Sequence, residues 1–187
     1  MRLVLVKHSL PEIDPRLPAA QWHLSDEGRR RARLLAAALV PYQVQEILSS
    51  QEPKAAETAR IAAETLAVPV CLHPGLHEHL RQTIRYMEKE QFEAHVRRFF
   101  SCPQELVFGE ETAAQAAGRF SRALDEALKG GTADSAAVVA HGTVISLYVS
   151  QVCGVDPFDL WKRLGLPSCV ILSLPERRID ALIEEIA

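Results

Sequence analysis

Short apolar runs and segments with helical spacing alternate along the first part of the chain. Residues 3–6 are apolar without interruption, which is typical of a strand that helices cover on both faces. From residue 26 to about residue 40, alanines and leucines recur at i, i+3, i+4 and i+7, and Ser25 precedes them in the position of an N-cap. The pattern predicts a buried strand and then an amphipathic helix that ends before Pro41.

The same alternation continues to residue 72. Residues 46–49 predict a second short strand, residues 53–66 a helix with Pro53 at its first position, and residues 68–72 a third strand. Strands that alternate with helices of this length imply parallel crossover connections. We therefore expect a layered sheet with helices on both faces.

The pattern is less regular between residues 73 and 111. Residues 87–100 still predict a helix, with its apolar side chains on one side: Phe92, Val96, Phe99 and Phe100. We interpret residues of about 81–110 as a small helical insertion over the sheet.

Regular patterns return in the C-terminal part. They predict a helix over 110–128 that Gly130 and Gly131 end, a buried strand over 136–140, helices over 142–153 and 156–164, and a strand over 169–174. Residues 178–187 fit a hairpin strand and a helix equally well. The fold expected is one α/β domain over residues 1–187, a three-layer α/β/α sandwich with a mostly parallel central sheet.

Composition and charge narrow the function. The formal net charge of −3 gives no basic field for nucleic acid or an anionic membrane. The apolar run at the N-terminus is too short for a signal peptide, and no run is long enough to span a membrane. We expect a cytoplasmic monomer or homodimer. Four scattered cysteines without a CxxC spacing predict buried free thiols: Cys71, Cys102, Cys153 and Cys169.

Two histidines follow buried strands and are the main candidates for chemistry. His8 follows the first strand and His141 the strand over 136–140, and ligands of open α/β sheets bind at the carboxyl ends of strands. Cations, hydroxyls and a helix N-terminus are expected around them, from Lys7, Ser49, Ser50 and Lys54. This combination predicts an anion pocket, for which phosphate is the natural occupant.

Several segments in order resemble the histidine phosphatase superfamily, also called the phosphoglycerate mutase-like family. They are Lys7-His8-Ser9, LSDEGRRRA at residues 24–32, SSQEPKAAETA at 49–59, Glu78 in LHEHL, Gly109-Glu110-Glu111-Thr112, and VVAHGTV at 138–144. The resemblance covers nearly the whole chain. It implies a phosphoglycerate mutase-like fold and a small phosphorylated substrate, with no cofactor and no metal.

The resemblance also implies roles for individual residues. His8 would attack phosphorus and become a phosphohistidine, and His141, protonated or donating a hydrogen bond, would stabilise the transferring group. Glu78 is the candidate acid and base, with His77, His79 and Glu88 as rivals. The phosphate ligands would be Lys7, Ser9, Ser50, Lys54 and Gly142.

The chain departs from the family at three of these positions. Lys7 and Lys54 stand where the family has arginines, which keeps the charge but loses the bidentate fork, and Ser9 replaces a glycine. Arg81 and Arg85 are candidates to restore guanidinium contacts. The leading hypothesis is a histidine acid-type phosphomonoester hydrolase with reduced activity. The alternatives are a phosphoester-binding or regulatory protein with little turnover, and a phosphoglycerate-type mutase.

One further alternative is a zinc site. His73, His77 and His79 stand within seven residues of one another, with Glu78 among them, and three imidazoles are a known zinc ligand set. Pro74 and Gly75 interrupt any regular helical face there, which favours the phosphate hypothesis.

Overall fold

The computed structural model describes residues 1–129 and 133–187, and these residues form a single mixed sheet of six strands. The strands are β1 (Arg2–Lys7), β2 (Glu46–Ser50), β3 (Val70–His73), β4 (Ser135–Ala140), β5 (Ser168–Ser173) and β6 (Arg178–Ile183). Their order across the sheet is β3-β2-β4-β1-β5-β6. The first four are parallel, and β5 runs antiparallel to both of its neighbours.

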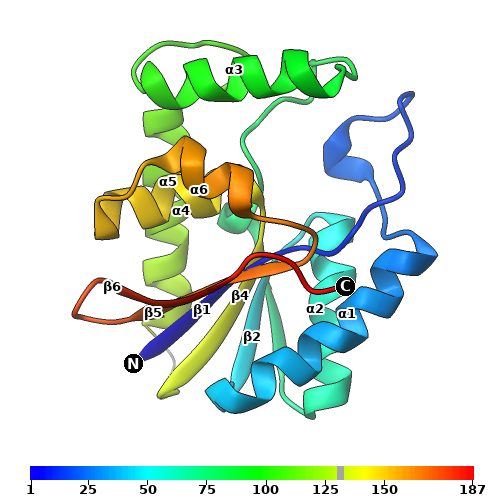
Figure 1. The fold of residues 1–187 in the computed structure, drawn as a ribbon, viewed down its shortest axis with the longest axis vertical. Helices are drawn as coiled ribbons and strands as arrows, with labels where there is room; N and C mark the ends of the chain where they lie inside the picture. Colours follow the sequence, from blue (N-terminus) through cyan, green and yellow to red (C-terminus); the bar gives the residue numbers. More distant parts are fainter. Residues whose placement is uncertain (130–132) are drawn as a thin grey trace.

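Helices cover both faces of this sheet. They are α1 (Asp26–Leu39), α2 (Pro53–Leu66), α3 (Lys89–Ser101), α4 (Ala113–Leu128), α5 (Gly142–Cys153) and α6 (Pro157–Arg163), with short 3₁₀ turns at Ala19–Gln21, Val40–Tyr42 and Pro74–Leu76. In Figure 1, α1 and α2 lie on one side of the sheet and α4, α5 and α6 on the other, while α3 lies beyond its upper end. The three-layer α/β/α fold is therefore confirmed.

The first strand shows why its residues form an unbroken apolar run. Leu3 and Leu5 face the core beneath α4 and α5, whereas Val4 and Val6 face the core beneath α1 and α2. Alternate side chains of a strand point to opposite faces, so a strand with both faces covered has no position for a polar residue. This burial places residue 8 at the edge where the strand leaves the sheet.

The starts of one helix and one strand differ from the prediction by two or three residues. The helix expected from residue 110 begins at Ala113, because Thr112 and Gln115 form a capping box in which each side chain accepts a hydrogen bond from the other's backbone N–H. The third strand begins at Val70, since Ala67 takes a left-handed conformation (φ +54°) that ends α2 and turns the chain. Gly130 and Gly131, expected to end a helix, lie outside the described residues.

The structure also shows the conformation of the terminal segment and the exposure of the cysteines. The terminal segment forms a strand, β6, which pairs antiparallel with β5. All four cysteines are free, but only Cys169 is buried, and Cys71 is exposed because it lies on the edge strand β3. The prediction of four buried thiols was therefore wrong. Within the described ranges, no helix has the length and apolar character needed to cross a membrane.

Candidate active site

The fold brings the two predicted histidines together. β1 and β4 are parallel neighbours, and the backbone N–H of His8 donates to Ala140 O (3.0 Å) just before His141. The two imidazole rings lie 5.2 Å apart, centre to centre, with an interplanar angle of 62°. His8 is 7% exposed and His141 is fully buried. Residues far apart in the sequence thus form one pair at the carboxyl edge of the sheet.

The protonation state of His8 follows from one hydrogen bond. Its Nδ1 lies 2.7 Å from Ser9 O, and because a carbonyl oxygen can only accept, Nδ1 carries the proton. Burial lowers the pKa of His8 well below its ordinary value, and the neighbouring His141, Lys54 and Lys7 lower it further, against the Ser9 hydrogen bond. The ring is therefore neutral at pH 7, with a free lone pair on Nε2.

Ser9 holds the segment that follows His8. Its backbone N–H donates to Thr58 Oγ1 (3.0 Å), and its hydroxyl donates to Gly28 O (2.7 Å). The hydroxyl predicted to bind phosphate is thus directed at α1 and serves to fix the backbone beside His8. The Ser9 hydroxyl is therefore not available to a phosphate group in this conformation.

The motif at residues 24–32 packs α1 against the same segment. Ser25 caps α1 by accepting from Gly28 N (3.0 Å) and also donates to Leu10 O (3.1 Å). An added Cβ on Gly28 would lie 2.0 Å from Leu10 O, so only glycine permits this approach. The serine and the glycine of the motif together position the loop that carries His8.

His141 has one partner and one open nitrogen. Its Nε2 lies 2.9 Å from Ser50 Oγ, whereas its buried Nδ1 has no hydrogen-bond partner among the described residues. Burial lowers the pKa of His141 well below its ordinary value, with Lys54 adding to this effect and Glu78 opposing it. In the free protein His141 is therefore neutral, and a neutral imidazole can still donate one hydrogen bond.

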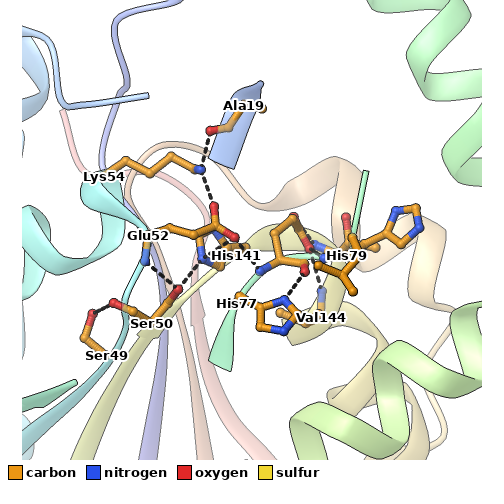
Figure 2. A network of polar contacts seen from close by, with 12 residues as sticks. Ala19, Ser49, Ser50, Glu52, Lys54, His77, His79, His141 and Val144 are labelled. Carbon is orange, nitrogen blue, oxygen red and sulfur yellow. Dashed lines mark hydrogen bonds and ion pairs between the residues drawn. The ribbon is translucent and has the colours of Figure 1, made fainter. Parts of the chain in front are cut away.

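Lys54 lies in the first turn of α2, and its ammonium is already paired. It donates to Ala19 O (2.7 Å) and to Glu52 Oε2 (2.5 Å), and Glu52 Oε1 lies 3.7 Å from His141 Nε2. Figure 2 shows Glu52 between Lys54 and His141. The sequence analysis missed Glu52, although a carboxylate two residues before a predicted phosphate ligand was a visible anomaly.

Lys7 takes a different direction from the one expected. Its ammonium donates to Leu164 O (2.6 Å), and its Cε would lie 3.2 Å from a Cβ added to Gly142. The lysine stem therefore passes over the start of α5, where Gly142 leaves room for it. Burial lowers the pKa of Lys7 to about 8, against the opposing charges of Glu78 and Glu185.

Glu78 lies at the N-terminus of α5. Its Oε2 accepts from Thr143 N (3.2 Å), and its Oε1 accepts from Val144 N (3.3 Å) and His79 N (2.9 Å). The positive end of the helix dipole and these N–H groups stabilise the anion. Arg81 lies 4.0 Å from Oε2.

These surroundings determine the charge of Glu78. Burial raises the pKa of its carboxyl, but Arg81, His141 and the His79 N–H outweigh burial, and the resulting pKa is below its ordinary value. Glu78 is thus ionised in the free protein. In this state it is ready to accept a proton rather than to donate one.

A charged brace holds the loop that carries Glu78. Arg119 of α4 donates to the backbone oxygens of Gly75, His77 and Glu78, at 2.9, 2.9 and 3.1 Å, and forms an ion pair with Glu111 (2.6 Å). Glu111 also accepts from Leu80 N. Glu111 of the segment at residues 109–112 thus holds the loop of Glu78 through Arg119 and through the backbone of Leu80. Arg119 had no signal in the sequence beyond its place on a predicted helix.

With this geometry in view, comparisons with known proteins identify the family. A profile of the histidine phosphatase superfamily (branch 1) matches residues 18–182. This chain belongs to the histidine phosphatase superfamily. The matched range begins after Lys7-His8-Ser9, so the role of that segment rests on its geometry. Among curated protein sequences, none matches significantly.

Solved structures of other proteins share the fold. The α-ribazole phosphatase from Shigella flexneri has 18% identity and a TM-score of 0.75, covering 100% of this chain and 98% of that one. A phosphoserine phosphatase mutant from Entamoeba histolytica has 16% identity and a TM-score of 0.75, covering 97% and 96%. YhfR of Bacillus stearothermophilus has 17% identity and a TM-score of 0.75, covering 98% and 96%. At these identities the likeness establishes the fold.

The side chains of the other candidates for the role of Glu78 have different partners. His77 Nδ1 donates to Glu78 O (2.8 Å), whereas His79 is buried against Phe99 and has its Nε2 3.2 Å from Glu111 O. Glu88 is the N-cap residue of α3. Of these candidates, Glu78 is the one whose carboxylate lies at the start of α5.

The zinc alternative does not fit the structure. His73 Nδ1 accepts from the backbone N–H of Gly75, and His77 and His79 take the separate partners described above. Over residues 1–129 and 133–187, no three His, Cys, Asp or Glu side chains are grouped to hold a metal ion. The three imidazoles are thus not a ligand set.

Two cavities lie beside the residues that surround His8 and His141. The first has a volume of about 390 Å³. Its lining includes the carboxylates of Glu52 and Glu78 and the cations of Lys54 and Arg81. The second, of about 220 Å³, shares Ala19 and Arg81 with the first and is mostly apolar: Ile13, Leu17, Trp22, Ile84, Tyr86, Met87 and Phe92. Arg81 therefore lies between a charged cavity and an apolar one, and Arg85 lines the apolar cavity.

Proposed function

We propose that this histidine phosphatase hydrolyses phosphomonoesters through a phosphohistidine on His8. The observation that carries the proposal is the Nδ1–H···O bond from His8 to Ser9, which leaves Nε2 as the free nucleophile of a neutral, buried ring. The position at the carboxyl ends of two parallel strands supports it. The names of the structural neighbours, which include phosphatases, agree with it.

The reaction would proceed in two displacements. In the first, the Nε2 lone pair attacks phosphorus, the bond between phosphorus and the alcohol oxygen breaks, and that oxygen leaves with the bonding electrons and takes a proton. In the second, water attacks the phosphorus of phosphohistidine, the P–N bond breaks, and the water proton passes to a base. His8 then returns to its neutral state, and inorganic phosphate is released.

Glu78 is the proposed acid and base for these steps. Because it is ionised in the free protein, it must first gain a proton before it can protonate the leaving alcohol. A bound phosphoryl group adds negative charge nearby, which raises the pKa of a neighbouring carboxyl. We therefore expect Glu78 to gain a proton when the substrate binds, to lose it to the alcohol, and to recover one from the attacking water.

The cations would stabilise the charge on the transferring phosphoryl group. Lys54 and Lys7 keep the charge of the family's arginines without their planar fork. Arg81 supports the idea of a restored guanidinium, because it lines the charged cavity and its buried Nη1 has no hydrogen-bond partner among the described residues. His141 and the backbone at Gly142 would donate the remaining hydrogen bonds.

Trapping the covalent intermediate tests this proposal. The protein is incubated briefly with an aryl phosphate that carries radioactive phosphorus, and the reaction is stopped with alkali. We expect an acid-labile phosphoenzyme in the wild type and none in His8→Ala. His95→Gln, which changes a half-buried histidine of α3, is the matched control and keeps the label. A phosphoenzyme that persists in His8→Ala contradicts the assignment.

A second candidate function is phosphoester binding with little turnover. The pairing of Lys54 with Glu52 favours it, because a phosphate ligand that is already neutralised attracts substrate less. If the protein releases no phosphate from a panel of small phosphomonoesters, yet phosphate raises its melting temperature, the binding function replaces hydrolysis. Transfer of the phosphoryl group from His8 to an added phosphoglycerate, instead of to water, would identify a mutase.

A further inference from the structure

The contacts of Glu52 resemble those that a phosphate would make. Its Oε2 contacts Lys54 Nζ at 2.5 Å, and its Oε1 lies 3.7 Å from His141 Nε2 and accepts from Glu78 N at 2.9 Å. The side chain is only 11% exposed. One carboxylate therefore contacts a cation and a backbone N–H, which are two of the donor types of an oxyanion site, and it lies beside the imidazole of His141.

This position conflicts with phosphate binding at the same donors. Charge-assisted contacts from an ammonium to an oxyanion fall at about 2.7–2.9 Å, so a phosphate oxygen bound by Lys54 needs the place that Glu52 Oε2 fills. Two anions at such a distance, away from bulk water, repel each other strongly. A second N–H of the Lys54 ammonium donates to Ala19 O. Phosphate and the Glu52 carboxylate thus compete for Lys54.

We propose that Glu52 is an internal counter-anion, which a phosphoryl group must displace from Lys54 and His141, and that it sets the affinity of the site for anions. This inference rests on the proposed function, because it takes Lys54 and His141 as phosphate ligands. In the free protein the carboxylate neutralises the buried Lys54. Once phosphate binds, Glu52 turns toward the 390 Å³ cavity that it already lines.

A purely structural role for Glu52 predicts the opposite effect. If Glu52 serves only to position Lys54 and the backbone of Glu78, its removal leaves Lys54 misplaced and weakens phosphate binding. If Glu52 competes with phosphate, removing its charge strengthens binding. The direction of the change in affinity therefore separates the two roles. Glu52→Gln suits this test, because it retains a carbonyl oxygen that accepts from Glu78 N.

Calorimetric titration with inorganic phosphate at pH 7 measures that direction. The matched control is Glu57→Gln, which also removes one carboxylate, but on the part of α2 that pairs with Arg29. We expect Glu52→Gln to bind phosphate about tenfold more tightly or better than the wild type, and Glu57→Gln to bind like the wild type. Unchanged or weaker binding by Glu52→Gln, or equal tightening in both variants, overturns the proposal.

A structure of the wild-type protein with vanadate gives an independent check that needs no variant to fold. The expected result is vanadate on Lys54 with the Glu52 carboxylate moved away, and vanadate bound beside an intact Lys54–Glu52 pair contradicts the inference. Both measurements are made at equilibrium. An active wild type with unchanged affinity in Glu52→Gln refutes only this inference, whereas a protein that neither forms a phosphoenzyme nor binds phosphate refutes the proposed function.

Discussion

The two sides of the active site are held by different kinds of contact. Around His8 the contacts are neutral: backbone groups, the hydroxyls of Ser9 and Thr58, and the close approach of Gly28 to Leu10. Around Glu78 they are charged: Arg119 with Glu111, Arg81 with Glu78, and Lys54 with Glu52. The proposed nucleophile thus sits in a frame that neither pH nor substrate charge disturbs. Charged contacts hold the proposed acid and base and the proposed anion ligands, and an arriving anion rearranges these contacts.

Breaking the neutral side has the largest expected effect. Gly28→Ala places a Cβ 2.0 Å from Leu10 O, and relief of that overlap requires the backbone to move. We expect a loss of about 3 kcal/mol in the free energy of unfolding, measured by urea denaturation. Gly118→Ala in α4 is the control, because its Cβ meets only the end of the Arg122 side chain and alanine favours a helix. Equal stability of Gly28→Ala and the wild type contradicts the packing argument.

Breaking the charged side is expected to affect turnover more than it affects folding of the sheet. Arg119→Met removes the donors to Gly75, His77 and Glu78, so the Glu78 carboxylate loses its fixed position. We expect kcat to fall by about 30-fold, since small displacements of a catalytic group have effects of this order. The ionisation in the pH profile of kcat that belongs to Glu78 should also shift.

Arg122→Met, which changes the same helix nearly one turn later, serves as the control for Arg119→Met. If both variants lose activity to the same extent, or if Arg119→Met changes only the melting temperature, the positioning role is refuted.

The pH dependence of activity tests whether the charge of Lys7 contributes to phosphate binding. Its pKa is lowered to about 8, so Lys7 is charged below pH 8, and its attraction for phosphate is lost as the pH rises through that value. We expect kcat/KM of the wild type to fall about tenfold by pH 9. Lys7→Arg stays charged and should keep its activity over the same range. A fall that persists in Lys7→Arg and disappears in Lys54→Arg would assign the ionisation to Lys54, whose pKa burial also lowers.

The smallest expected effect is that of Lys54→Arg at pH 7. A guanidinium gains the bidentate geometry for phosphate, but Glu52 still neutralises it, so we expect kcat/KM to rise only about two- to threefold. The increase should grow in the double variant with Glu52→Gln. A loss of activity in Lys54→Arg would instead indicate a site built for lysine. Initial rates with an aryl phosphate measure both.

The fold was predictable because its signals are local. The apolar run of β1, the cap at Ser25, and Pro53 at the start of α2 each act within a few residues, and strand and helix order then limits the topology. The start of α4 was missed, because the capping box of Thr112 and Gln115 outweighs the hydrophobic spacing. Residues 178–187 were ambiguous, since pairing with β5 across the intervening turn, rather than their own residue pattern, decides their structure.

The site was predictable where a motif fixes a backbone position, as for His8 and His141. Side-chain direction was not predictable. Ser9 turns to Gly28 and Lys7 to Leu164, and both contacts join residues that are distant in the sequence. Arg119 and Glu52 were missed because their roles arise from loops that meet only in the folded protein.

Both tryptophans of the chain adjoin the proposed site. Trp22 lines the apolar cavity and accepts from Lys54 N through its backbone oxygen, and Trp161 Nε1 would lie 3.4 Å from a Cβ on Gly142, beside the Lys7 stem. The intrinsic fluorescence of this protein is therefore expected to report on its own active site. Filling of the apolar cavity should change the emission of Trp22, and displacement of Lys7 that of Trp161. Single-tryptophan variants would thus follow substrate binding and phosphate release separately, without an attached label.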